Sequence, residues 1–347
     1  MATYKGIKGV RVESLATDPT ALGAAGTVWY NTSSPTALKY GVSSPGAWSS
    51  CTNFPTKLEN ASAFGTATAA VCGVGYEGPP ASPAYTTTTF EYDGTTWGSP
   101  ATTGHQGGAQ GVAGTQTAGL MAAGYWSPAS RDPVYINAET ETYDGSTWSP
   151  VADVNTKRTG LRGTGSTTAA IMAGGAEVTG PTPATAGTNK TETWNGTSWT
   201  EVNNLNTARL PGGSLGTTCP AATAVIVGGT STTNVYDLTE VWDGTSWTEV
   251  ADLNTARGKL GGAGSVSTSG IVFGGEGPGQ KDETEVWDGT SWAEAGDLAT
   301  AKWGVSGTGT GSAAISVGGT QGSVPTLQAG TEEWNSPALV IKTVTIS

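Results

Sequence analysis

The sequence predicts an all-β fold in which four-stranded sheets close into a ring, and three recurring features predict it. A tryptophan returns at steps of 49, 51, 51, 48 and 45 residues, at Trp48, Trp97, Trp148, Trp199, Trp247 and Trp292. Each of the last five follows a hairpin signature of one aromatic, Asp-Gly or Asn-Gly, and two Ser or Thr residues. A glycine doublet, or a degenerate form of it, ends an apolar strand in each repeat. A tandem period of about 50 residues with four strands per unit is typical of a β-propeller.

The repeat at 160–203 shows how the strands are assigned. Residues 160–166 form a small-residue strand, which we place innermost, and 168–175 form an apolar strand. The glycine pair that ends this second strand permits the positive φ of a sharp exit. Residues 191–194 form the third strand, and Asn195-Gly196 is a strong two-residue hairpin signal before the outer tryptophan strand.

The number of blades depends on how the two ends of the array complement each other. The last third strand, at 331–334, has no tryptophan strand after it, whereas residues 47–49 supply an unmatched one at the other end. Joining the ends removes two exposed sheet edges. We therefore predict a six-bladed propeller whose last blade is closed by the N-terminal Trp48 strand. The alternative is seven blades, in which the hairpin at 28–40 forms a blade although it lacks a glycine-pair strand.

The glycine doublet, the aromatic and the tryptophan at this period resemble the kelch repeat across 45–336, with departures in two degenerate doublets. The chain also resembles kelch-like structural proteins of tailed phages of marine bacteria, chiefly at its ends. That likeness lies in residues 6–10, the hairpin at 28–41, and the 331–334 ending that precedes 342–345. The resemblance implies a virion component.

Three segments are predicted: an N-terminal extension or arm at 1–44, the β-propeller at 45–336 and a C-terminal strand at 337–347. Neither end contains a copy of the repeat, and both leave the same composite blade. We expect the ends to meet in a small β extension that pairs with a neighbouring subunit or another virion protein. The alternative is that they wrap the chain's own propeller.

Composition excludes several classes of function. The net charge of −12 and the lack of a Lys/Arg cluster argue against nucleic-acid binding. No segment approaches 18 consecutive apolar residues, so membrane insertion is not expected. The single histidine, His105, cannot supply the imidazole ligands of the copper-radical oxidases that share kelch-like propellers, nor a catalytic triad with a second base. We therefore expect no catalytic residues, no metal and no cofactor.

Two charged positions recur and are interpreted as structural pairs. Four repeats carry Arg or Lys ten residues after the tryptophan and Glu seventeen residues before that cation: Glu141 with Arg158, Glu192 with Arg209, Glu240 with Arg257, and Glu285 with Lys302. In the Trp97 repeat, Phe90 and Gly107 occupy these positions, so acid and base are lost together. The simultaneous absence of the acid and the base favours an ion pair between them within each repeat. The geometry of an arginine–carboxylate pair suits such a structural role. The alternative is a cationic ring at the mouth of the central channel.

Long insertions between second and third strands lie at 76–88, 125–138 and 176–190. In an up-and-down blade these loops share one face with the blade-to-blade linkers, and such a face often binds a partner. The candidate binding residues there are Tyr76, Tyr85, Tyr125, Trp126, Arg131 and Tyr135. Aromatic rings held among prolines suit stacking on a sugar or a protein; the alternative is that they fold back over their own loops.

The resemblance and the loop face together predict a non-enzymatic virion protein, located on the tail or particle surface. We expect a tail-associated, fibre- or adhesin-like protein within an oligomeric assembly. Its partners would be other virion proteins and a host surface glycan or protein. The alternatives are a capsid decoration protein, a cellular lectin or protein-binding kelch module, and, ranked last, a carbohydrate-active enzyme, since carboxylate pairs are not excluded by count.

Overall fold

The structure is a computed structural model that describes residues 13–20, 27–33, 37–44, 46–78, 85–104, 107–126, 135–177, 187–215, 221–322 and 326–343. In these residues the regular structure is β-strand, apart from the short 3-10 helix η2 (Ala221–Thr223). The chain divides into two compact units. Unit 1 combines residues 1–47 and 336–347, and unit 2 spans 48–335.

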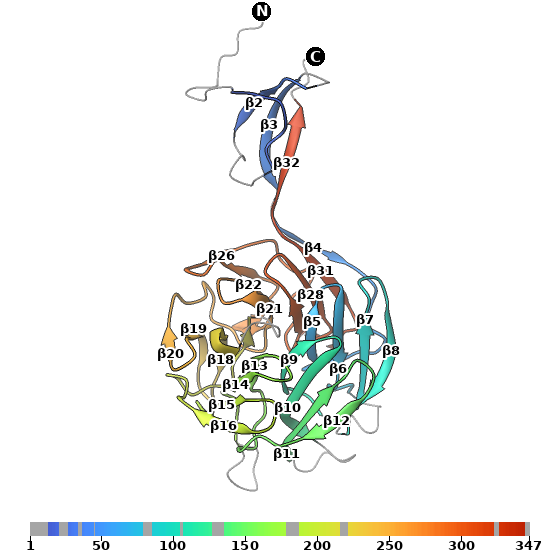
Figure 1. The fold of residues 1–347 in the computed structure, drawn as a ribbon, viewed down its shortest axis with the longest axis vertical. Coiled ribbons are helices and arrows are strands. Elements are labelled where there is room, and N and C mark those ends of the chain that lie inside the picture. Colours follow the sequence, from blue (N-terminus) through green and yellow to red (C-terminus); the bar gives the residue numbers. More distant parts are fainter. Residues whose placement is uncertain are drawn as a thin grey trace, which may run out of the picture. The chain divides into compact units, whose positions relative to one another are not determined.

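Unit 2 is a β-propeller of four-stranded antiparallel sheets, and its first five blades run in chain order from the innermost to the outermost strand (Figure 1). The first blade contains β5 (Ser62–Thr66), β6 (Ala69–Gly73), β7 (Thr88–Tyr92) and β8 (Trp97–Thr102). The second contains β9 (Gly111–Thr115), β10 (Ala118–Trp126), β11 (Tyr135–Tyr143) and β12 (Trp148–Val151). The third contains β13 (Arg162–Gly165), β14 (Ala170–Ala173), β15 (Thr191–Trp194) and β16 (Trp199–Val202).

The remaining blades follow the same plan. The fourth contains β17 (Gly213–Ser214), β18 (Val225–Thr230), β19 (Val235–Trp242) and β20 (Trp247–Glu249). The fifth contains β21 (Gly261–Val266), β22 (Ser269–Phe273), β25 (Thr284–Trp287) and β26 (Trp292–Glu294). Two short hairpins, β23 (Glu276–Gly277) with β24 (Gly279–Gln280) and β29 (Thr320–Gln321) with β30 (Thr326–Leu327), lie in loops between second and third strands.

The closing blade joins the two ends of the repeat array, as predicted from the unmatched strands at 47–49 and 331–334. It contains β27 (Ser306–Gly309), β28 (Ala313–Val317), β31 (Thr331–Asn335) and, beside β31, the N-terminal strand β4 (Ala47–Ser50). The described residues of unit 2 thus contain six four-stranded sheets. Their innermost strands contact one another in order, and β27 contacts β5, so the ring has no open edge.

In the second to fifth blades and in the closing blade, the indole N–H of the recurrent tryptophan binds the third strand of the preceding blade, whereas Trp97 of the first blade donates to the Thr52 carbonyl at 3.2 Å. In four blades the indole N–H donates a hydrogen bond to a threonine hydroxyl. The pairs are Trp148 with Thr89 at 3.1 Å, Trp199 with Thr140 at 3.2 Å, Trp247 with Thr191 at 3.1 Å and Trp292 with Thr239 at 3.0 Å. Trp48 makes the same bond to Thr284 at 2.9 Å. Trp48 therefore occupies the tryptophan position of the closing blade.

The predicted cations are all buried in ion pairs, but the predicted partners are wrong. Each cation pairs with the glutamate of the following blade: Arg158 with Glu192 at 2.9 Å, Arg209 with Glu240 at 2.5 Å, Arg257 with Glu285 at 2.8 Å, and Lys302 with Glu332 at 3.1 Å. The physical reason is the path of the linker. It leaves the outer strand of one blade and crosses the end of the next blade's third strand before it becomes the next innermost strand.

The glutamate at each crossing also holds the linker backbone. Glu192 accepts the backbone N–H of Asn155 at 2.7 Å, and Glu240, Glu285 and Glu332 accept equivalent linker N–H groups. Glu141 accepts the N–H of Gly104 at 2.8 Å. Glu141 therefore keeps this role although the linker before it carries Gly107 at the cation position.

At the seam between the closing and first blades, apolar side chains replace the ion pair. Leu58 stands at the cation position and Phe90 at the glutamate position, and both belong to one cluster. Phe54 packs edge-on against Phe90 at 5.4 Å and against Trp97 at 4.8 Å between ring centroids. The changes at Phe90 and Gly107 thus belong to two different junctions, so their joint loss was not an argument for pairing within one repeat.

Unit 1 is one sheet with the order β1 (Glu13–Leu15), β2 (Val28–Asn31), β3 (Ala37–Ser44) and β32 (Ala338–Thr343). The hairpin of the seven-blade alternative is therefore paired with β1 and β32. Asp18 accepts bonds from Lys39 at 2.6 Å, Asn31 at 2.5 Å and the buried Trp29 at 3.1 Å. Chiefly the Lys39 bond lowers the pKa of Asp18. The two segments outside the repeats thus fold together.

Arg209→Ala is expected to lower the free energy of unfolding by about 3–5 kcal/mol, because it leaves the buried Glu240 without its cation. Chemical denaturation of a double-mutant cycle between Arg209 and Glu240 should show clear coupling. The matched control is the cycle between Arg209 and Glu192, whose own partner is Arg158. Coupling to Glu192 in place of Glu240 would contradict the shifted pairing.

Deletion of residues 1–52 is expected to unfold or aggregate unit 2, because it removes β4 and exposes the edge of β31. It also removes Trp48, whose ring packs against Phe273 at 4.6 Å and Trp334 at 5.5 Å. Thermal melting and light scattering measure the outcome. A truncated chain that stays monomeric and melts like the full chain would show that β4 does not close the ring.

Candidate binding face

The loop face of unit 2 is formed by the linkers that enter the innermost strands and by the loops that leave the second strands. Isolated β-bridges join these two sets in every blade: Glu59 with Tyr76, Gly108 with Tyr125, Thr159 with Ala176, Leu210 with Thr230, Gly258 with Glu276 and Trp303 with Thr320. The bridges place the long insertions and the linkers on one side, as the repeat pattern indicated.

Three of the six predicted binding residues have described side chains on this face. Tyr76 and Tyr85 form a β-bridge, and their half-buried rings pack at 5.3 Å between centroids. Burial raises the pKa of Tyr85 to about 12. Tyr125 is half-buried and lines a cavity at the channel mouth. The half-buried tyrosines thus partly cover their own loops and are partly exposed to solvent. This arrangement is compatible with both alternatives, stacking on a ligand and covering the loop backbone.

The other three residues are less fully described. Trp126 and Tyr135 pair across β10 and β11 at the far end of that hairpin. Arg131, like the single histidine His105, lies outside the described residues. The repeat-pair residues are located at the blade crossings, where they are buried in ion pairs or bind linker backbone. They do not form a cationic ring at the channel mouth.

A groove of about 480 Å³ lies on the loop face at the seam of the ring. It is lined by Lys57, Glu59, Tyr76, Glu77, Gly78, Trp303, Thr326 and Leu327. These residues come from the segment after β4, the loops of the first and closing blades, and the linker before β27. The repeat pattern pointed to Tyr76 alone, because the others meet only when the ring closes.

The groove combines aromatic faces with polar groups. Glu59 accepts a hydrogen bond from the Thr320 hydroxyl, and burial raises the pKa of both Glu59 and Glu77. The Lys259 ammonium lies 4.2 Å from the centre of the Trp303 ring and 2.7 Å from Glu276. This cation–π contact helps to hold the ring in place.

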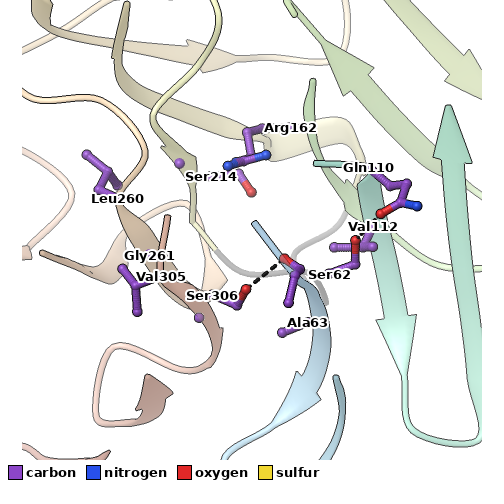
Figure 2. A pocket seen from close by; sticks show the side chains of 14 residues that line it. Ser62, Ala63, Gln110, Val112, Arg162, Ser214, Leu260, Gly261, Val305 and Ser306 are labelled. Carbon is purple, nitrogen blue, oxygen red and sulfur yellow. Dashed lines mark hydrogen bonds between the residues drawn. The ribbon is translucent and has the colours of Figure 1, made fainter. Parts of the chain in front are cut away.

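The central channel is lined by residues of all six innermost strands and the positions just before them (Figure 2). Ser62 donates to the Gln110 side chain at 2.6 Å, Ser214 to the Gly163 carbonyl at 3.0 Å and Ser306 to the Ala61 carbonyl at 2.7 Å. The Arg162 side chain extends into the same space (Figure 2). The repeat pattern did not single out Arg162, although the equivalent residue is Gly or Ser in the other five blades.

Backbone hydrogen bonds link neighbouring blades around the channel mouth. The N–H groups of Asn60, Ala109, Gly160 and Gly304 each donate at 2.9 Å to the carbonyl of the equivalent residue one blade earlier. Pro211 occupies the same position in the linker before β17 and has no N–H to donate. Asn60, Ala109 and Lys259 hold positive φ angles of 51°, 55° and 50° there. Such strain is maintained by surrounding structure and clusters at functional sites.

Two other kinds of site are absent from the described part of the chain. No group of three or more His, Cys, Asp and Glu residues there is arranged to hold a metal ion. No helix among the described residues has the length and apolar character needed to cross a membrane.

Comparisons with known proteins agree with the fold. The solved structure of YjhT, a kelch-type β-propeller, superposes with a TM-score of 0.66 and covers 84% of this chain and 99% of its own. The two chains are 11% identical, so the similarity shows the fold alone. No protein-family model and no curated protein sequence matches the chain. By fold, the protein is a β-propeller.

Proposed function

We propose that this chain is a tail-associated virion protein whose loop face binds a surface glycan in the seam groove. The observation that carries the proposal is the groove itself, in which Tyr76 and Trp303 stand beside Glu59, Glu77 and Lys57. Ligand sites generally combine aromatic walls with a few polar groups that orient the ligand. Aromatic faces pack on the C–H faces of sugars, and carboxylates accept hydrogen bonds from their hydroxyls.

The virion part of the proposal rests on the resemblance of the chain ends to kelch-like structural proteins of tailed phages. The ends supply all strands of unit 1, and β32 pairs with β3 over six residues, from Ala338 opposite Ser44 to Thr343 opposite Lys39. Attachment to other virion proteins is assigned to this unit and glycan binding to the loop face. A capsid decoration protein remains the second candidate, since the same unit would serve attachment to a head.

Tyr76→Ala and Trp303→Ala should each weaken glycan binding at least about tenfold, a loss of about 1.4 kcal/mol of binding free energy. The measurement is a glycan array with the purified full chain, followed by titration of the best ligand. The matched control is Tyr30→Ala, since Tyr30 is 43% exposed and belongs to unit 1. Wild-type chain that binds no glycan, or groove variants that bind normally, would refute the proposal. Released cleavage products would favour the carbohydrate-active enzyme instead.

Removal of residues 338–347 should leave unit 2 folded and reduce incorporation into particles, because it deletes β32 from the unit 1 sheet. Quantitative mass spectrometry of purified particles compares the copy number with that of the full chain. Immunogold labelling of the full chain should mark the tail, and a label on the head would favour the decoration protein. A truncated chain incorporated at full copy number would show that unit 1 is not the attachment element.

A further inference from the structure

The innermost strands begin at equivalent residues, and one of them departs from the repeat. These first residues are Ser62, Gly111, Arg162, Gly213, Gly261 and Ser306. Small residues suit this position because space is short. A Cβ on Gly111 would lie 2.4 Å from Met172 Sδ, and one on Gly261 would lie 2.3 Å from a Phe273 ring carbon. A repeated residue is one the fold needs, so the arginine of β13 requires a different explanation.

Arg162 is also unlike the other arginines of the propeller. Arg158, Arg209 and Arg257 each contact a glutamate, whereas the hydrogen bond seen for Arg162 goes to the carbonyl of its neighbour Leu161 at 3.2 Å. No Asp or Glu is found among the described residues that line the channel or its mouth. Arg162 is half-buried, so its guanidinium is partly shielded from water and has no carboxylate partner among these lining residues.

The position of Arg162 makes it reachable from solvent. It lines both the channel and the mouth cavity, whose other walls include Tyr125, Leu210, Pro211 and Lys259. Burial lowers the pKa of Arg162 to about 10, so the guanidinium stays charged at neutral pH. The protein as a whole carries a net charge of −12, whereas the channel lining is positively charged at Arg162.

We propose that the central channel binds a small oxyanion, a carboxylate or a phosphate, on the Arg162 guanidinium. The planar fork of guanidinium donors matches two oxygens of such an anion. The mouth cavity admits the ligand, and Arg162 alone carries the binding because Lys259 at the rim is paired with Glu276 at 2.7 Å. The ligand is a free small anion.

This site is independent of the glycan groove. The residues that line the groove include neither Arg162 nor any other residue of the channel or mouth cavity. Failure of glycan binding therefore leaves the anion site intact, and failure of anion binding leaves the groove proposal intact.

The test uses the full chain and inorganic phosphate, acetate and chloride as probes, at constant ionic strength and neutral pH. Isothermal titration calorimetry and thermal melting should detect binding of phosphate or acetate to the wild-type chain, and the stronger of the two identifies the ligand class. Arg162→Ser should weaken that binding at least tenfold. This variant is expected to fold, because β5 and β27 begin with serine at the same position.

The matched control is Lys157→Ser, which removes one exposed positive charge outside the channel and should bind like wild type. Without added anion, Arg162→Ser should melt at or above the wild-type temperature, since it removes an unpaired cation. Arg162→Lys should bind more weakly than wild type because it keeps the charge but loses the fork. Absence of binding to wild type, equal binding to Arg162→Ser, or a chloride response equal to that of both oxyanions would overturn the proposal.

Discussion

The ring depends on one recurring contact, in which a buried cation of the linker meets the glutamate of the blade that the linker enters. At the third blade, Arg158 binds Glu192 at 2.9 Å, and Glu192 also accepts the Asn155 N–H at 2.7 Å. One carboxylate thus fixes both a side chain and the backbone of the crossing segment. Removing one partner would leave a buried charge without compensation, so each crossing is held strongly in place.

The junctions that lack this contact show what can replace it. At the seam, Leu58 and Phe90 pack with Phe54 and Trp97, which removes the cost of desolvating charges. The closing blade beside this seam joins the two ends of the repeat array, because β4 lies beside β31. The apolar contact at this seam suits a junction that forms only when the first and closing blades, which are distant in the chain, come together.

Departures from the repeat identify the candidate sites more clearly than the repeat itself. The groove lies at the seam, where Tyr76 and Trp303 come from opposite ends of the array. Arg162 stands at a position that is glycine or serine in the other blades. Residues that recur in every blade are needed for the propeller fold. Residues that differ from the repeat are not constrained in this way and are therefore candidates for binding.

The sequence by itself determined the repeat period, the strand order, the closing strand at 47–49 and the face that carries the long loops. These features are encoded in local spacing, glycine pairs and turn residues. Only the tertiary structure decided which glutamate each cation meets, because the linker path places Arg209 beside Glu240 and not Glu192. It also decided that Arg162 faces the channel without a carboxylate and that Trp303 shares a groove with Tyr76. Those contacts join residues far apart in the chain, and they exist only once the ring has closed.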